Sequence, residues 1–152
     1  MKITYKGDYA LKALFQLALR YGEGSVLSIN DIAKPGDMPI KFLEQILLNL
    51  RKGGFVRSKR GASGGFVLAR HPKDITVGEV IRFIEGPLEP ISCIEEERYK
   101  GCKDTANCIF RDVWRQVSQA ISVVVDTLTF EELVIRHKER GLGIKSVYEY
   151  SI

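Results

Sequence analysis

The sequence predicts a mainly α-helical chain that carries one small β-hairpin wing and ends in a long helix. Three observations support this fold class. Apolar residues recur at spacings of three and four along several segments, two β-prone runs flank a glycine-rich turn at 61–65, and a regular apolar series occupies 110–128. With 152 residues, 45% of them apolar, the chain is long enough for one packed domain and an additional helical arm.

Charge is distributed unevenly along the chain. The net charge is +4, but residues 1–73 carry 13 Lys and Arg against 5 Asp and Glu, whereas residues 74–152 carry 10 against 14. The first part therefore has a net charge of +8, which favours a polyanionic partner, with an excess of lysine on a solvated face as the alternative. No segment approaches the about 20 apolar residues of a membrane span, and the N-terminus shows no export signal. We therefore expect a cytoplasmic protein without a membrane partner.

The first elements are helices separated by turn-rich breaks. Apolar spacing predicts a helix over 5–21 and a short helix over 29–33. Ser28 and Asp31 fit a capping box at the start of the short helix.

A helix and a hairpin follow the turn residues at 34–37. Pro39 opens the helix at a position that tolerates proline, and Gly53 and Gly54 end it. Residues 55–60 and 66–68 have the composition of two strands around the glycine-rich turn. The predicted buried face of the helix is Leu43, Ile46, Leu47 and Leu50.

The C-terminal half contains three more helices and one long loop. Thr76 caps a helix over 77–85, and a loop over 88–108 holds all three cysteines. A loop of this length in a compact domain is usually functional or disordered. A long helix follows the loop, and Thr129 can cap a final helix over 130–140.

The order of elements over residues 28–69 is that of a winged helix-turn-helix domain. The second helix of such a unit enters the major groove, where Gln45 and Asn49 can bond adenine and Glu44 can accept from cytosine. Five cations that follow this face would neutralise phosphates, and Arg60 at the glycine turn suits a minor groove. The alternative is a solvated helix face beside a surface hairpin. The predicted DNA-binding residues are Ser28, Pro39, Ile40, Lys41, Glu44, Gln45, Asn49, Arg51, Lys52, Arg57, Lys59, Arg60, Gly61, Ser63 and Gly64.

Four segments follow from this pattern. They are a winged helix-turn-helix domain at 1–86, a cysteine-bearing loop at 87–108, dimerisation helices at 109–140 and a tail at 141–152. The long helix has apolar residues at alternating intervals of four and three, which is the seam of a helix pair. The predicted dimer residues are Phe110, Trp114, Val117, Ile121, Val124 and Leu128.

Three stretches resemble one family of bacterial regulators. They are KFLEQILLNLRKGGFVRSKRGASGGFVLAR, TYKGDYALKAL and ITVGEVIRFIEGP. Together they resemble the IscR/NsrR/CymR family of winged-helix transcriptional regulators, and the cysteines favour its cluster-binding, IscR/NsrR-like branch. The resemblance covers about residues 2–135 and implies homodimers that bind inverted-repeat operators in double-stranded DNA. It also implies that Glu44 and Arg60 help to set the DNA sequence preference.

The cysteines Cys93, Cys102 and Cys108 have the spacing C-x8-C-x5-C. Thiolates are the usual ligands of iron–sulfur clusters, and three cysteines without an export signal disfavour a disulfide framework. The resemblance implies an iron–sulfur cluster with two or four irons, although the first interval is longer than in the best-known members. Inert thiols, a zinc site and a thiol–disulfide switch are the alternatives.

A fourth cluster ligand is implied only by the resemblance. Arg111 stands where IscR has a histidine ligand, whereas NsrR-type members use an aspartate from the first helix of the partner protomer. Asp8 matches that aspartate and is the predicted fourth ligand, with Asp104, Asp112 and Glu95–Glu97 as local rivals. The alternative for Asp8 is a cap on the first helix.

The predicted function is a dimeric DNA-binding regulator whose operator binding responds to the cluster. The implied mechanism is that gain, loss or oxidation of the cluster changes how the two DNA-binding heads sit on adjacent major grooves. The alternative is a regulator of the same fold that is controlled by thiol oxidation or, as in CymR-type members, by a partner protein. A small redox enzyme is disfavoured, because the chain has no C-x-x-C pair and only two histidines.

Overall fold

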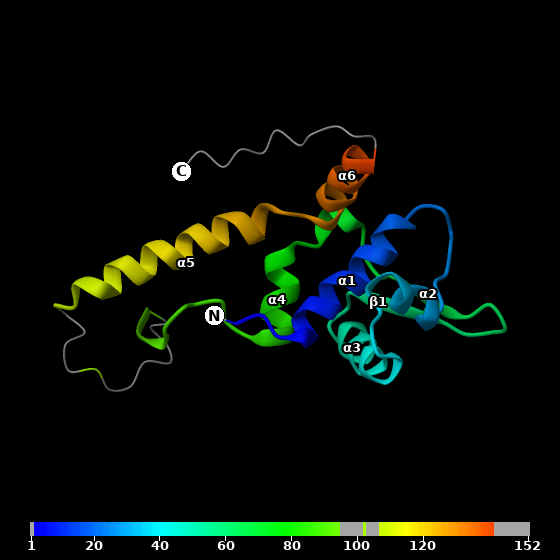
Figure 1. Cartoon of the computed structure of the whole chain (residues 1–152), viewed down its shortest axis with the longest axis horizontal. Coiled ribbons are helices and arrows are strands. Elements are labelled where there is room, and N and C mark those ends of the chain that lie inside the picture. Colours follow the sequence, from blue (N-terminus) through cyan, green and yellow to red (C-terminus); the bar gives the residue numbers. More distant parts are fainter. Residues whose placement is uncertain (1, 95–101, 103–106, 142–152) are drawn as a thin grey trace.

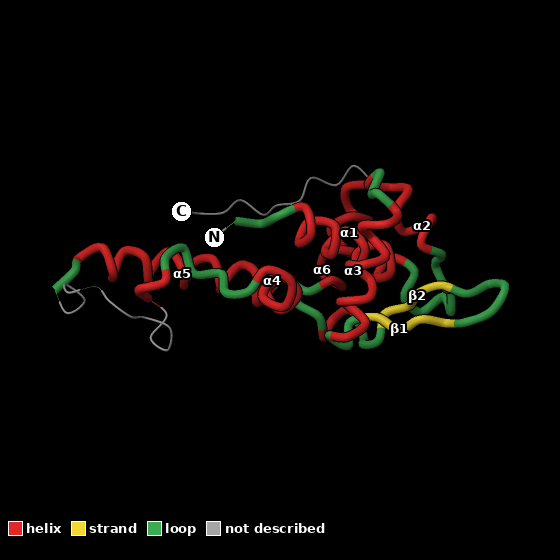
Figure 2. The backbone as a smooth tube through the Cα atoms, turned by 90° about the horizontal axis from the view of Figure 1, so that it is seen from below, coloured by secondary structure: helices red, strands yellow, loops and turns green. Residues whose placement is uncertain are grey.

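The structure is a computed structural model, which describes residues 2–94, 102 and 107–141. A helical head carries a hairpin that extends from one side, and helix α5 projects from the opposite side (Figure 1, Figure 2). The predicted fold class, mainly helical with a β-hairpin wing and a long C-terminal helix, is confirmed. The elements are α1 (Tyr5–Leu19), α2 (Ile29–Ala33), η1 (Lys34–Gly36), α3 (Ile40–Lys52), β1 (Val56–Lys59), β2 (Gly65–Leu68), η2 (Pro72–Asp74), α4 (Val77–Glu85), η3 (Ser92–Ile94), α5 (Ile109–Thr127) and α6 (Phe130–Gly141).

The N-terminus of α1 is held by a cap and by a carboxylate from α4. The hydroxyl of Thr4 accepts from the N–H of Lys6 at 3.2 Å, so the alternative that Asp8 caps this helix is wrong. Oε1 of Glu85 accepts from the N–H of Thr4 at 3.0 Å, from its hydroxyl at 2.6 Å and from the N–H of Gly7 at 2.9 Å. Desolvation opposes ionisation of Glu85, but these hydrogen bonds outweigh it and lower its pKa.

The C-terminus of α1 differs from the sequence prediction. The helix ends at Leu19, two residues early, and the chain then turns through Gly22 and Gly24, which both have positive φ. Tyr21, which continues the apolar spacing of the helix, is therefore 42% exposed rather than part of the core. Its ring packs edge-on against His71 at 4.9 Å between centroids.

Helices α2 and α3 form the helix-turn-helix. Ser28 and Asp31 make the predicted capping box, with each side chain accepting from the other residue's backbone N–H at 3.2 Å. The hydrogen bonds from Ser28 lower the pKa of Asp31. The chain turns at Asp37, which has the left-handed φ of 46°, and enters α3 after Pro39. The predicted buried face of α3 is confirmed at Leu43, Ile46, Leu47 and Leu50.

The hairpin continues the head as a small sheet. Strands β1 and β2 are antiparallel, and Val56 pairs with Leu68 at the end nearest the core. Leu27 and Phe66 exchange backbone hydrogen bonds at 3.1 and 2.8 Å, which ties the chain before α2 to the outer edge of β2. This connection fixes the hairpin relative to the helix-turn-helix.

Helices α4 and α6 complete the core. Phe130 at the start of α6 is fully buried, although 19-residue α5 separates it from the rest of the head in the sequence. Each large apolar side chain buried in this way stabilises the fold by about 1.5–3 kcal/mol. The largest fully buried side chains are Phe55, Phe130, Leu14, Ile32, Leu43, Ile46, Leu47, Leu50, Ile75, Val56 and Val80.

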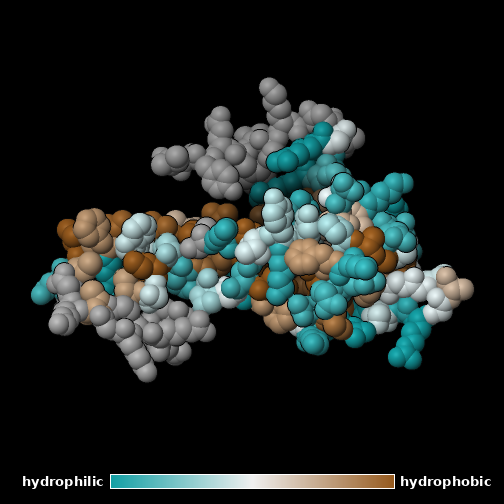
Figure 3. Space-filling model, turned by 60° about the horizontal axis from the view of Figure 1, so that its bottom comes forward, coloured by the Kyte–Doolittle hydropathy of each residue, from teal (hydrophilic) through white to brown (hydrophobic). Residues whose placement is uncertain are grey.

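Helix α5 has no buried residue. It projects from the head (Figure 1), and hydrophobic side chains gather along it (Figure 3). The helix ends at Thr127, so Leu128 of the predicted dimer seam lies in the linker to α6. Across the described part of the chain, every helix is too short or too polar to span a bilayer. Apart from Gly141, the predicted tail at 141–152 lies outside the described residues.

Candidate nucleic-acid interface

Helix α3 presents a polar outer face because its apolar stripe is turned into the core. Lys41, Glu44 and Gln45 are exposed on that face, and Asn49 is half-buried beside them. No side chain caps the N-terminus of α3, where Pro39 is the N-cap residue. The first backbone N–H groups of the helix are thus available to an oxygen ligand such as a phosphate.

The predicted DNA-binding residues lie on the surface of the head. Ser28, Asn49 and Gly64 are half-buried. The others are exposed, namely Pro39, Ile40, Lys41, Glu44, Gln45, Arg51, Lys52, Arg57, Lys59, Arg60, Gly61 and Ser63. All of them belong to α2, α3 or the hairpin, or directly adjoin these elements, and these are the three elements that a winged helix-turn-helix applies to DNA.

The cations at residues 51–59 lie on the two faces of the hairpin, Arg51 of α3 on one and Arg57 and Lys59 of β1 on the other. Arg51 of α3 approaches Ser58 of β1, with Nη1 at 3.5 Å from Oγ. Because side chains alternate along a strand, Arg57 and Lys59 point to the opposite face from Ser58. There they line an open hollow of about 330 Å³ together with Arg20 from the end of α1. The sequence analysis listed five cations between residues 51 and 60, and the structure adds Arg20 to the pair formed by Arg57 and Lys59.

The tip of the hairpin requires glycine. Gly61 has a φ of 122°, which L side chains rarely adopt. A Cβ on Gly64 would approach the carbonyl oxygens of Lys59 and Gly61 to 2.7 and 2.8 Å. These two glycines keep the turn narrow and leave Arg60 exposed directly before it.

The cysteine-bearing segment meets the start of α5. Cys93 lies in η3, and its carbonyl oxygen accepts from Nε of Arg111 at 3.1 Å, which holds this backbone against the first turn of α5. Cys108 directly precedes that turn, and Cys102 lies between the two in sequence. Cys93 and Cys108 are half-buried and Cys102 is exposed. Three thiols are a suitable donor set for an iron–sulfur cluster, although no three potential metal ligands gather in one group among the described residues.

A carboxylate that the sequence did not single out lies near this segment in the chain. Oε2 of Glu89 is buried, and the described residues supply no hydrogen-bond donor to it. Burying such an oxygen without a hydrogen bond is costly, and the electrostatic attraction between Glu89 and the guanidinium of Arg82 offsets part of this cost. A single glutamate forms no sequence motif, so the special environment of Glu89 becomes visible only from the burial of its carboxylate in the structure.

Asp8 lies in the first turn of α1 and is accessible. Its Oδ2 is 2.6 Å from Nζ of Lys12, and this hydrogen bond raises the pKa of Lys12. Asp8 also lines an open hollow of about 490 Å³ beside Ile3 and Tyr5. Among its rivals, Asp112 is exposed and lies 3.5 Å from Arg115, while Glu95–Glu97 and Asp104 lie outside the described residues.

The predicted dimer seam divides into an exposed and a half-buried part. Phe110, Trp114, Val117 and Val124 are between 36 and 65% exposed, whereas Ile121 and Leu128 are half-buried. Ile109 and Val113 extend the exposed apolar surface near the start of α5. An apolar surface of this kind on a projecting helix is typical of a protein–protein contact.

Comparison with known proteins identifies the family to which this chain belongs. The model of the Rrf2 family, described as iron-dependent transcriptional regulators, matches residues 3–136. The chain belongs to the Rrf2 family. An rrf2-like HTH-type transcriptional regulator of Rhodobacter capsulatus is 42% identical over 137 residues, which cover 87% of this chain and 91% of that relative.

Two solved structures of Rrf2-type regulators are similar over nearly their whole length. CymR (YrzC), the global cysteine regulator of B. subtilis, has a TM-score of 0.77 at 35% identity, covering 90% of this chain and 98% of that chain. IscR of T. potens has a TM-score of 0.73 at 36% identity, covering 92% of this chain and 90% of that chain. The protein is therefore a DNA-binding transcriptional regulator of the Rrf2 family and not an enzyme.

Proposed function

We propose that this Rrf2 regulator is a homodimer that binds an inverted-repeat operator, and that an iron–sulfur cluster on Cys93, Cys102 and Cys108 controls that binding. The observation that carries the DNA-binding part is the exposed polar face of α3 beside an exposed basic hairpin. A regulator of this kind acts where the DNA is, so we place it in the bacterial cytoplasm. The four predicted segments, with boundaries after 86, 108 and 140, are part of this proposal.

Within the head, each element has a separate task. Glu44, Gln45 and Asn49 face outward on α3 and contact base edges in the major groove. Arg51 and Lys52 at the end of α3, with the hairpin cations, contact phosphates on either side. Ser28, Pro39, Ile40 and Lys41 border the same groove, and Arg60, Gly61, Ser63 and Gly64 bring the hairpin tip to the minor groove.

Dimerisation is supported by the exposed apolar surface of α5. In a symmetric dimer, Phe110, Trp114, Val117 and Val124 of one helix meet the same residues of the other. Ile121 and Leu128, which are half-buried, complete the seam. Two heads then face adjacent major grooves, whose half-sites are about 34–36 Å apart.

The cluster is supported by the position of the thiols at the junction of the head and α5. Cys93, Cys102 and Cys108 would hold it, and Asp8 of the second protomer is the proposed fourth ligand. When bound, the cluster supplies an oxidation-sensitive link between the two protomers. Arg111 fixes the backbone of Cys93 beside Cys108, and Asp8 must exchange its ion pair with Lys12 for the new contact.

A second candidate is a regulator without a cluster that responds to thiol oxidation or to a partner protein. The ion pair between Asp8 and Lys12 favours it, because this aspartate is already satisfied in the protomer. The similarity to CymR is consistent with either function.

Spectroscopy and operator binding distinguish the two candidates. The full chain, purified without oxygen, is analysed by visible absorption and by iron and sulfide assays, beside Cys102→Ala and Asp8→Ala. Asp112→Ala removes the exposed rival carboxylate of α5 and is the comparison that separates the two assignments of the fourth ligand. We expect iron and sulfide in the wild-type protein, their loss in Cys102→Ala, and a shifted spectrum in Asp8→Ala only. A colourless wild-type protein that still binds its selected operator contradicts the cluster and supports the second candidate.

A further inference from the structure

The base of the projecting helix α5 is anchored to α4 at two levels. At the first level, the linker between α5 and α6 pairs with the chain before α4. The N–H of Val77 donates to the carbonyl of Leu128 at 2.9 Å, and the N–H of Phe130 donates to the carbonyl of Ile75 at 3.0 Å. These bonds fix the position of the helix end but leave its direction to a second contact.

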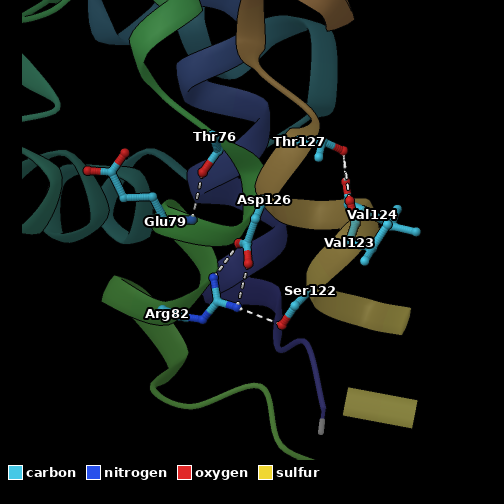
Figure 4. A network of polar contacts seen from close by, with 8 residues as sticks. All are labelled: Thr76, Glu79, Arg82, Ser122, Val123, Val124, Asp126 and Thr127. Atoms are coloured by element: carbon cyan, nitrogen blue, oxygen red, sulfur yellow. Dashed lines mark hydrogen bonds and ion pairs between the residues drawn. The ribbon is translucent and has the colours of Figure 1, made fainter. Parts of the chain in front are cut away.

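The second level is a fork of hydrogen bonds from Arg82 of α4 (Figure 4). Its Nη1 lies 2.5 Å from Oδ1 of Asp126, and its Nη2 lies 3.0 Å from Oδ2 of Asp126 and 3.1 Å from Oγ of Ser122. The two acceptor residues lie one turn apart on α5. A planar guanidinium that bonds both of them opposes rotation and tilt of the helix more than a point charge would.

A glycine brings the two helices close enough for this fork. A Cβ on Gly78 would overlap the Asp126 carboxylate and approach Nη1 of Arg82 to 2.8 Å and Cγ2 of Val125 to 2.9 Å. Because α5 has no buried residue, apolar packing contributes little to fixing its direction, and the polar contacts have the larger share. The direction of α5 relative to the head therefore depends on Arg82 at its base, while the hydrogen bond from Arg111 to the carbonyl of Cys93 holds η3 against its other end.

The length of α5 amplifies any change at this contact. Phe110 lies twelve positions before Ser122, which is about 18 Å of helix. A tilt of about 10° at the fork displaces the far end by about 3 Å, close to the rise of about 3.4 Å per base pair of DNA. In a dimer both protomers contribute, so the separation of the heads changes by the equivalent of at least one base pair.

We propose that the contact of Arg82 with Asp126 and Ser122 sets the half-site spacing that the dimer accepts in its operator. This inference rests on the proposed dimeric, operator-binding function. Arg82 is a positioning residue, because it lies outside the predicted DNA-binding and dimer-seam residues. Its pair with Asp126 is 37 and 43% exposed, so it contributes little to stability, and its effect is on geometry.

The test compares spacing preference in Arg82→Gln, Asp126→Asn and the wild type. The operator is first selected from random duplexes with the wild-type full chain. Affinities are then measured for duplexes that keep both half-sites but differ in spacing by one or two base pairs. Arg70→Gln is the matched control, because Arg70 bonds Glu79 at 2.7 Å with exposures of 37 and 42% but stays within the head.

We expect the wild type to prefer one spacing by about tenfold, the scale of a single unfavourable change in a site. In Arg82→Gln and Asp126→Asn this preference falls to about twofold or less, while the preferred half-site sequence is unchanged. Arg82→Lys, which keeps the charge but not the fork, gives an intermediate preference. Arg70→Gln keeps the wild-type spacing profile.

A second measurement reports on the helix direction without DNA. Distances between spin labels on the head and near the start of α5, carried by unnatural amino acids so that the cysteines stay intact, should broaden in Arg82→Gln only. Unchanged distances, or an unchanged spacing profile, overturn the role of Arg82. Selection of a single half-site by the wild type instead overturns the dimeric function, and the spacing role with it.

Discussion

Removal of Arg57 and Lys59, the two cations of strand β1, tests the DNA-binding surface most directly. Arg57 and Lys59 lie on the face of the hairpin opposite to Ser58, and among the described residues neither forms an ion pair. The double variant Arg57→Gln/Lys59→Gln should therefore leave the free energy of unfolding nearly unchanged. Its effect should appear in the salt dependence of operator binding.

The magnitude follows from counting phosphates. Five cations lie between residues 51 and 60, so a dimer that uses all of them neutralises about ten phosphates, and log K falls with log salt at a slope of about −9. The double variant removes four contacts per dimer, which reduces the slope to about −5. Between about 50 and 200 mM salt, the wild type should lose about 10⁵ in affinity and the variant about 10³.

Fluorescence anisotropy of a labelled operator over a series of KCl concentrations measures both slopes. Lys73→Gln/Lys138→Gln removes the same charge from η2 and α6, which are not part of the hairpin, and serves as the control. The assignment is refuted when the hairpin variant and the control change the slope equally. A slope that drops in the hairpin variant alone supports phosphate contacts by Arg57 and Lys59.

Three further predictions concern the head and the dimer. Glu85→Gln should be less stable than the wild type at neutral pH. The pKa of Glu85 in the folded protein lies below its ordinary value of 4.5. The extra stability of the wild type should therefore disappear as the pH falls from 4.5 through the folded-state pKa. Parallel urea titrations would contradict this if the difference in unfolding free energy between the two proteins stayed constant from pH 7 to 3. Gly61→Ala forces an alanine to a φ of 122°, so chemical denaturation should show a loss of about 1–3 kcal/mol, unless the hairpin tip adopts another turn. Trp114→Asp places a charge in the predicted seam, and sedimentation velocity should show a monomer, whereas Gln116→Asp, on a different side of the helix, stays dimeric.

Local patterns predicted the helix-turn-helix well. The capping box of Ser28 and Asp31 and the buried stripe of α3 are encoded within a few residues of one another, so spacing alone identified them. The same spacing rule failed at Tyr21, because periodicity cannot indicate that the chain leaves the helix at Leu19.

Contacts between residues that are far apart in the chain could not be predicted from local patterns in the sequence. Glu85 lies 81 residues from Thr4, and Arg82 lies 44 residues from Asp126, so neither pair forms a recognisable motif. The grouping of Arg20 with the hairpin cations likewise depends on where α1 ends in space. The cysteine spacing predicted donors of the right type, but the buried oxygen of Glu89 appears only when the chain is folded.

The position of α5 between α4 and α6 has a consequence for how the chain is made. Phe130, which lies beyond α5, fills the centre of the head, so the head cannot close its core until the ribosome has already produced the whole of α5. A chain that stops before residue 130 lacks a core side chain whose removal typically costs about 3–5 kcal/mol. The apolar surface of α5 is thus exposed before its own head is complete. In the proposed dimer this is the pairing surface, so neighbouring nascent chains on one messenger would pair through α5 while their heads are still folding.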